Sequence, residues 1–196
     1  MLSGETAAGK YPVGVVETMS RIAARTEQAL PYAEILRSRR LQGTLSVTDA
    51  ISYATCTAAI NLKASAIISA SRSGHTARMV AKYRPQATVV AATHYPQVMR
   101  KLALVWGVKP VLIPETSGTD ELLEESIKSA LEAKYIEYGD LVILTAGVPS
   151  NTAGGTNMMK VHVVGKIITH GMGIGKQSVS GRARVIYHEG DLDKIE

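Results

Sequence analysis

The sequence contains no phenylalanine and few aromatic residues of any kind. Its 196 residues include eight tyrosines and one tryptophan, so aromatics make up 5% of the chain. A hydrophobic core must therefore be built from Ala, Val, Ile, Leu and Met, which suits close packing of helices on a sheet better than an aromatic-rich β-sandwich. The length is enough for one ordinary domain with an extension.

Cysteine is represented by Cys56 alone. A single cysteine excludes an intrachain disulfide and fits a reducing compartment, so we expect a cytoplasmic protein. Because Cys56 stands among small residues in a helical pattern, we interpret it as a buried structural thiol rather than a nucleophile. The five histidines show no metal-ligand spacing with it, and no metal site is expected in this chain.

Long apolar runs are also absent, and nothing at the start of the sequence has the basic and apolar regions of a signal peptide, so no membrane partner is expected. Lysine and arginine outnumber acidic residues by 22 to 17, which gives a net charge of +5. This surplus favours phosphorylated ligands. It is dispersed, and its densest spot, at Arg37, Arg39 and Arg40, has no interleaved aromatic residues for base stacking, so no nucleic-acid partner is expected.

Helical periodicity alternates with short apolar runs along most of the chain. Helices are predicted over residues 13–30, 46–62, 75–83, 96–105 and 119–135, and strands over 66–70, 88–92, 108–113 and 141–146. Strands that are apolar throughout are covered on both faces, and helices between successive strands imply parallel crossovers. The sequence therefore predicts an α/β fold with three αβα layers. Residues around Val161 and Val163, and around Ile167 and Ile168, suggest further β structure.

Two glycine-rich patterns are not nucleotide sites. Residues 4–10 match most of a Walker A loop, but Tyr11 stands where the magnesium-binding Ser or Thr belongs, and no strand precedes the pattern. Residues 171–175 lack the final glycine of a dinucleotide-binding loop and lead into strand-like residues rather than a helix.

The strongest candidate for ligand chemistry is the segment 71–76, between the first predicted strand and the helix that follows. Ligands bind at the carboxyl ends of strands in open α/β sheets, and unpaired N–H groups at a helix start favour a phosphate. The glycine would let the backbone approach an anion closely, the serines and threonine would add hydroxyl donors, and the arginine a charge-assisted bond. A well-capped helix with a solvated arginine is the alternative, and the residues alone leave both open. The candidate residues are Ser71, Arg72, Ser73, Gly74, His75 and Thr76.

Residues 1–12, with the sequence MLSGETAAGKYP, resemble the stretch that closes the catalytic barrel of pyruvate kinases. Residues 66–85, 102–112 and 140–164 are similar to parts of that family's C-terminal, effector-binding domain. The likeness covers nearly the whole chain and points to bacterial, bacillus-type members. It implies a five-stranded, mostly parallel sheet with an antiparallel last strand.

The resemblance also divides the chain. Residues 1–30 are expected to form the barrel-closing loop and a linking helix, 31–45 a connector, and 46–170 the αβα effector domain. Residues 171–196 resemble the start of the extra C-terminal sequence of bacillus-type enzymes, and we expect that piece to be incomplete.

The family transfers phosphate from phosphoenolpyruvate to ADP, the last step of glycolysis, with Mg²⁺ and K⁺. By resemblance its catalytic groups lie upstream of Met1, so we expect no catalytic residue and no cofactor in this chain, and no activity of the chain alone. Ser3 and Glu5 match residues at the rim of the active site. The implied partners are the rest of the pyruvate kinase chain and further copies in a homo-oligomer.

In allosteric members, the segment that matches residues 71–76 holds a phosphate of a sugar-phosphate activator, and His75 stands where some members carry arginine. A second effector loop follows the fourth strand and is represented here by Gly147, Val148, Pro149, Gly154 and Gly155. Members activated by fructose 1,6-bisphosphate can use an arginine in that loop, but residues 147–155 contain neither arginine nor lysine. A monophosphate, such as ribose 5-phosphate, glucose 6-phosphate or AMP, is therefore the expected effector.

Two other functions stay open. A stand-alone enzyme or sensor could use the same domain on a small phosphorylated metabolite, although it would have no use for the barrel-closing stretch. An oligomerisation module is the other, and helix 13–30 favours it because the apolar face of that helix needs a partner.

Overall fold

The computed structural model describes residues 4–39, 46–147 and 155–165. Five strands form one sheet in the order β3-β2-β1-β4-β5. Their bounds are β1 (Ala66–Ala70), β2 (Thr88–Thr93), β3 (Val108–Leu112), β4 (Leu141–Ala146) and β5 (Met158–Val163). The pairs among β1 to β4 are parallel, and β5 runs antiparallel to β4. The predicted α/β fold with an antiparallel last strand is confirmed.

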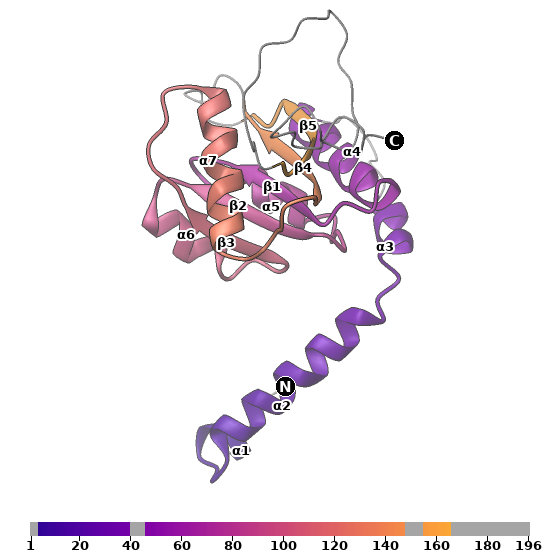
Figure 1. Cartoon of the computed structure of the whole chain (residues 1–196). Coiled ribbons are helices and arrows are strands. Elements are labelled where there is room, and N and C mark those ends of the chain that lie inside the picture. The colour runs from indigo at the N-terminus through magenta and orange to yellow at the C-terminus, as the bar shows by residue number, and fades with distance from the viewer. Residues whose placement is uncertain (1–3, 40–45, 148–154, 166–196) are drawn as a thin grey trace, which may run out of the picture. The chain divides into compact units, whose positions relative to one another are not determined.

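Seven helices are present in the described ranges (Figure 1). They are α1 (Gly4–Ala7), α2 (Pro12–Gln28), α3 (Tyr32–Ser38), α4 (Val47–Asn61), α5 (His75–Ala81), α6 (Pro96–Leu102) and α7 (Thr119–Glu132). Proline occupies the first turn of α2 and α6, where its missing N–H costs no hydrogen bond. Ser46 caps α4, because its hydroxyl accepts a hydrogen bond from the Asp49 backbone N–H. The expected connector at 31–45 contains α3, which the sequence did not predict.

The core consists of one apolar cluster on each face of the sheet, because successive strand residues point to opposite faces. On one face, Ile68, Val90 and Leu144 pack in a cluster with α7, which crosses that face in Figure 1. On the other face, Ile67, Val89 and Ile143 pack in a cluster with residues of α4, α5 and α6. Every residue of the central strand β1 is buried, as its predominantly apolar pattern predicts.

The strand register aligns the carboxyl ends of three strands. Ala70, the last residue of β1, lies opposite Ala92 of β2 on one side and Ala146 of β4 on the other. Because β5 is antiparallel, it begins at this same edge, with Met158 opposite Ala146. The segments that follow β1, β2 and β4, and the one that precedes β5, therefore meet at one edge of the sheet.

Asp49 links the start of α4 to the end of α5. Its carboxylate accepts hydrogen bonds from the Lys82 ammonium at 2.9 Å and the Ser46 hydroxyl at 2.7 Å, and the Tyr83 hydroxyl lies 3.4 Å away. The bonds from Lys82 and then Ser46 hold the pKa of Asp49 below its usual value. Burial, followed by the nearby Asp49 charge, raises the pKa of Tyr83 to about 12.

Cys56 lies fully inside the cluster formed with α5, and its thiol donates to the backbone oxygen of Val80 at 3.6 Å. Burial raises the pKa of this thiol to about 12. A thiol that stays protonated is a poor nucleophile, so the sequence interpretation of Cys56 as a buried structural residue is confirmed.

Helix α2 has no buried residue. Its apolar side chains are largely open to solvent, with exposed fractions of 69% at Val13, 51% at Val16 and 57% at Ile22. The last turn makes a specific contact, because Glu27 accepts a hydrogen bond from the Trp106 indole at 3.0 Å. The Arg84 guanidinium lies 4.3 Å from the centroid of the same indole ring.

Among the described residues, no helix is both long and apolar enough to cross a bilayer.

Candidate phosphate-binding site

The segment 71–76 lies where the sequence predicts, directly after β1. The Ser71 backbone N–H donates to the Ala92 oxygen at 3.0 Å, so the chain leaves the sheet along the end of β2. Gly74 caps α5 with φ of +75°. A Cβ at this position would lie 2.9 Å from Leu102 of α6, a side chain that is 1% exposed. Glycine is therefore required here both by the left-handed backbone and by close packing of the loop on α6.

Arg72 is exposed and directed to the segment that follows β2. Its Nη2 donates to the Tyr95 hydroxyl at 3.0 Å, and its guanidinium carbon lies 5.9 Å from the centroid of the Tyr95 ring. Tyr95 was not among the residues predicted from the sequence. The available signal was its position just after the second strand, at the same sheet edge as Arg72.

The remaining loop residues divide by exposure. Ser73 and His75 face solvent, and the His75 backbone N–H donates to the Ser73 hydroxyl at 3.4 Å. Thr76 is only 5% exposed, and its hydroxyl accepts a hydrogen bond from the Thr156 hydroxyl at 2.8 Å. The Thr156 backbone N–H donates in turn to the Thr48 hydroxyl at 3.1 Å. The groups that a ligand in solvent can meet first are therefore those of Arg72, Ser73 and His75.

The second predicted loop is partly described. Val148, Pro149 and Gly154 lie outside the described residues, whereas Gly147 and Gly155 lie inside them. A Cβ on Gly147 would lie 2.2 Å from the Gly155 carbonyl oxygen, so the two ends of this loop touch. Thr156 directly follows and bonds to Thr76. The bases of the two predicted effector loops are thus joined by a buried hydroxyl pair.

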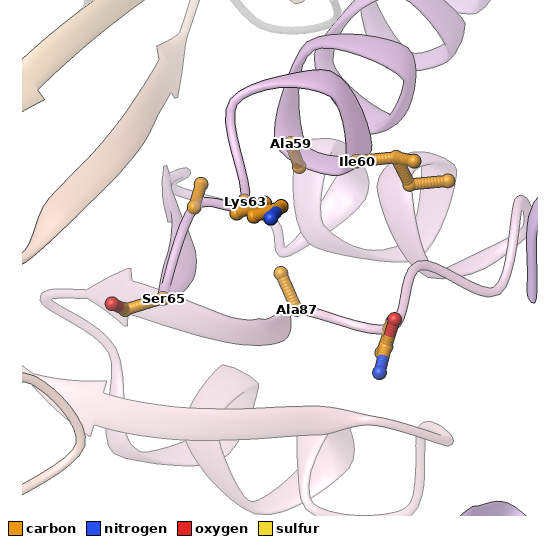
Figure 2. Close-up of a pocket in the computed structure, with 7 residues that line it drawn as sticks. Ala59, Ile60, Lys63, Ser65 and Ala87 are labelled. Carbon is orange, nitrogen blue, oxygen red and sulfur yellow. The ribbon is translucent and has the colours of Figure 1, made fainter.

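A pocket of about 570 Å³ lies elsewhere, at the amino ends of β1 and β2 (Figure 2). Its lining residues are Ala59, Ile60, Lys63, Ala64, Ser65, Gln86 and Ala87. Lys63 is its one charged side chain, and the pocket lies at the opposite edge of the sheet from residues 71–76. The pocket and the loop predicted to bind phosphate therefore lie at different places. We base the candidate site on the loop, because convergent polar groups fix a ligand's orientation.

Two further residues, Ser3 and Glu5, were expected from the resemblance to match the rim of an active site. Glu5 lies exposed in α1, and Ser3 lies outside the described residues. In the parts of the chain that the structure covers, no three His, Cys, Asp or Glu side chains gather as a metal ion would need.

The sheet order, the antiparallel last strand and the paired loops define a three-layer α/β domain with a mixed sheet. The family described as pyruvate kinase, alpha/beta domain matches residues 49–162. Pyruvate kinases of Sporosarcina psychrophila and Geobacillus stearothermophilus are each 48% identical to the chain over 185 residues, which cover 94% of this chain and 32% of theirs. The chain belongs to the pyruvate kinase family and carries its C-terminal alpha/beta domain.

Solved structures agree with this assignment. A crystal structure of a pyruvate kinase from Cryptosporidium parvum superposes with a TM-score of 0.74 at 32% sequence identity, covering 84% of this chain and 32% of that one. The chain spans about a third of the length of the curated relatives it matches. The resemblance stated from the sequence is therefore confirmed for the family and the fold.

Proposed function

We propose that this protein supplies the effector-binding domain of a cytoplasmic pyruvate kinase, whose whole reaction transfers phosphate from phosphoenolpyruvate to ADP. The ligand of this domain is a phosphorylated effector with one phosphate, such as ribose 5-phosphate, glucose 6-phosphate or AMP. By the same resemblance, the Mg²⁺ and K⁺ of the reaction would be held by the catalytic part of such an enzyme rather than by this domain.

The arrangement of Arg72 and Ser73 at the carboxyl end of the central strand carries this proposal. Both side chains are exposed, and Arg72 is held by an uncharged partner, so its positive charge stays available to an anion. A guanidinium group matches the oxygens of a phosphate in a two-point contact, and a nearby hydroxyl adds a further donor. Residues 147–155 contain no second cation, which favours one phosphate over two.

The buried hydroxyl pair supplies a route from the loop to the rest of the domain. Thr76, at the end of the loop, bonds to Thr156 before β5, and Thr156 bonds to Thr48 at the start of α4. A ligand that orders residues 71–75 would therefore bias the position of α4 and of the chain entering β5. An effector acts in this way when it binds two arrangements of a protein with different affinity.

The proposal is tested by measuring thermal unfolding with a panel of sugar monophosphates, sugar bisphosphates, AMP and inorganic phosphate. A ligand at one hundred times its dissociation constant stabilises the folded state by about 2.7 kcal/mol. For a chain of this length that corresponds to a rise in Tm of roughly 5–10 °C. We expect such a rise with a monophosphate for the native chain, and none for the Arg72→Ala, Ser73→Ala double variant.

Arg100→Ala is the matched control, because Arg100 is an exposed arginine in the last turn of α6 and lies outside the candidate loop. It should keep the full response to ligand. The proposal fails if no phosphorylated compound shifts the transition, or if the loop variant responds as strongly as the native chain.

The exposed apolar face of α2 favours a partner for this helix, and we propose the rest of the pyruvate kinase chain as that partner, in a homo-oligomeric enzyme. Val16, Met19 and Ile22, spaced three residues apart, line this face and are exposed. If the chain instead self-associates through it, analytical ultracentrifugation will show dimers that a Val16→Lys, Ile22→Lys variant abolishes. That outcome would support the oligomerisation function over the linking role.

A further inference from the structure

Helix α6 holds the candidate loop at two points. At its start, the Tyr95 hydroxyl accepts a hydrogen bond from Arg72 at 3.0 Å. At its end, Leu102 fills the space that a side chain on Gly74 would occupy. The loop after β1 is therefore held by contacts from the next strand–helix unit. Tyr95 contacts Arg72, and Leu102 packs at Gly74.

The Tyr95 backbone is fixed by its surroundings. It precedes Pro96, which restricts its backbone to extended conformations, and it is the N-cap residue of α6 with φ of −107° and ψ of 113°. Its carbonyl oxygen accepts hydrogen bonds from the backbone N–H groups of Val98 and Met99, each at 3.0 Å. Its ring is half-buried. The phenol oxygen is thus presented from a well-anchored position.

Arg72 has the opposite properties. Its side chain is long and exposed, so without a partner it would sample many rotamers and lose that freedom on binding an anion. In the described part of the chain its side-chain partner is a neutral phenol rather than a carboxylate, so the contact restrains the guanidinium without neutralising it. A guanidinium group has five N–H donors, of which Tyr95 engages one, and a two-point edge remains for a phosphate.

We propose that Tyr95 is a positioning residue, which holds the Arg72 guanidinium over the carboxyl end of β1 in the orientation that accepts a phosphate group. This inference rests on the proposed effector site, because it assigns the ligand's charge partner to Arg72. Tyr95 acts through Arg72 and makes no contact with the ligand itself.

The first experiment needs no ligand. In ¹⁵N-labelled chain, the side-chain Nε–Hε signal of Arg72, assigned by its loss in Arg72→Ala, should show a restrained heteronuclear NOE. Tyr95→Phe keeps the ring and removes the hydroxyl, and it should give this signal the NOE of a freely mobile arginine. Tyr138→Phe is the control, because Tyr138 is 61% exposed, and it should leave the signal unchanged. An Arg72 signal that is equally mobile in the native chain and in Tyr95→Phe would overturn the inference.

The second experiment measures binding of ribose 5-phosphate and of inorganic phosphate by calorimetry. Tyr95→Phe should weaken binding by roughly threefold to tenfold, the range that corresponds to the net contribution of one ordinary hydrogen bond. In the Arg72→Ala background the same change should have no further effect. Equal or tighter binding by Tyr95→Phe, or a full effect in the Arg72→Ala background, would overturn the inference.

The two experiments separate this inference from the proposed function. If the native chain binds neither probe, nor any other member of the phosphate panel, the proposed function fails, and the NOE comparison still decides whether Tyr95 restrains Arg72. If the native chain binds a probe and Tyr95→Phe behaves like it in both experiments, the effector site stands and the role of Tyr95 is refuted.

Discussion

Replacing Gly74 with alanine tests how tightly the candidate loop is packed on α6. Two penalties combine at this position. The backbone has φ of +75°, and a Cβ would lie 2.9 Å from Cδ2 and 3.0 Å from Cγ of Leu102. The left-handed conformation costs an alanine about 1–2 kcal/mol, and forcing a methyl group into a filled core site costs about 1–3 kcal/mol more. We therefore expect Gly74→Ala to lower the free energy of unfolding by about 2–5 kcal/mol.

A matched control isolates the packing part of this loss. Gly107 has nearly the same backbone conformation, with φ of +68°, but nothing lies within 4 Å of a Cβ built there. Gly107→Ala should therefore lose only the conformational part, about 1–2 kcal/mol. Urea unfolding followed by far-UV circular dichroism gives both values from the transition midpoints.

The expected difference between the two variants is about 1–3 kcal/mol, with Gly74→Ala the less stable. Combining Gly74→Ala with Leu102→Ala should cost less than the sum of the single changes, because the smaller side chain vacates the space that the new methyl group needs. Equal losses for the two glycine variants, or strict additivity with Leu102→Ala, would refute the claim that α6 packs directly against this loop.

Three further predictions concern the Asp49 ion pair, the buried Cys56 thiol and the contact between Arg84 and Trp106. Asp49→Asn should lower the free energy of unfolding by about 1 kcal/mol at neutral pH. Because the bond from Lys82 depresses the folded-state pKa of Asp49, this loss of stability should stay constant down to about pH 4 and shrink at lower pH. A loss that grows in acid would contradict this. Cys56 should react with a thiol reagent only as the chain unfolds in urea, since burial raises its pKa to about 12, and rapid labelling of the native chain would contradict its buried position. Arg84→Ala should shift the fluorescence of Trp106, the single tryptophan, to longer wavelength by uncovering the ring, and an unchanged spectrum would show that the guanidinium does not cover it.

Buried strands were predictable from the sequence because burial leaves a simple signature. The strand predicted over residues 141–146 has the same first and last residues as β4, and the strand predicted over 66–70 has those of β1. The edge strand β5 was harder to place. It is largely exposed along its length, so burial imposed no apolar run on it, and only part of Met158–Val163 was expected to be β structure.

Helix α3 was not predicted from the sequence for a different reason, its short length. Its seven residues bury only Leu36, and they stand beside arginines that suggested a solvated connector. A helix this short has too little periodicity to be distinguished from a loop, and it is stabilised by contacts with α4 rather than by its own sequence.

The candidate site was predictable in position but not in its contacts. The loop at 71–76 follows from its place between a strand and a helix. The bond between Arg72 and Tyr95 depends on the register that sets Ala70 opposite Ala92, and a single sequence does not give that register. The bond between Thr76 and Thr156 joins segments from opposite ends of the domain, and it appears only once the antiparallel strand is placed.

The central place of β1 has a consequence for how the chain is made. On one side β1 pairs with β2, the next strand along the chain, and on the other with β4, which follows much later. As the chain leaves the ribosome, β1, β2 and β3 can pair early, whereas the second edge of β1 stays open until Leu141–Ala146 has been synthesised. An open edge on a largely apolar strand invites pairing with other chains. Ribosomes stalled before residue 141 should therefore release chains that aggregate more readily than chains that include β4.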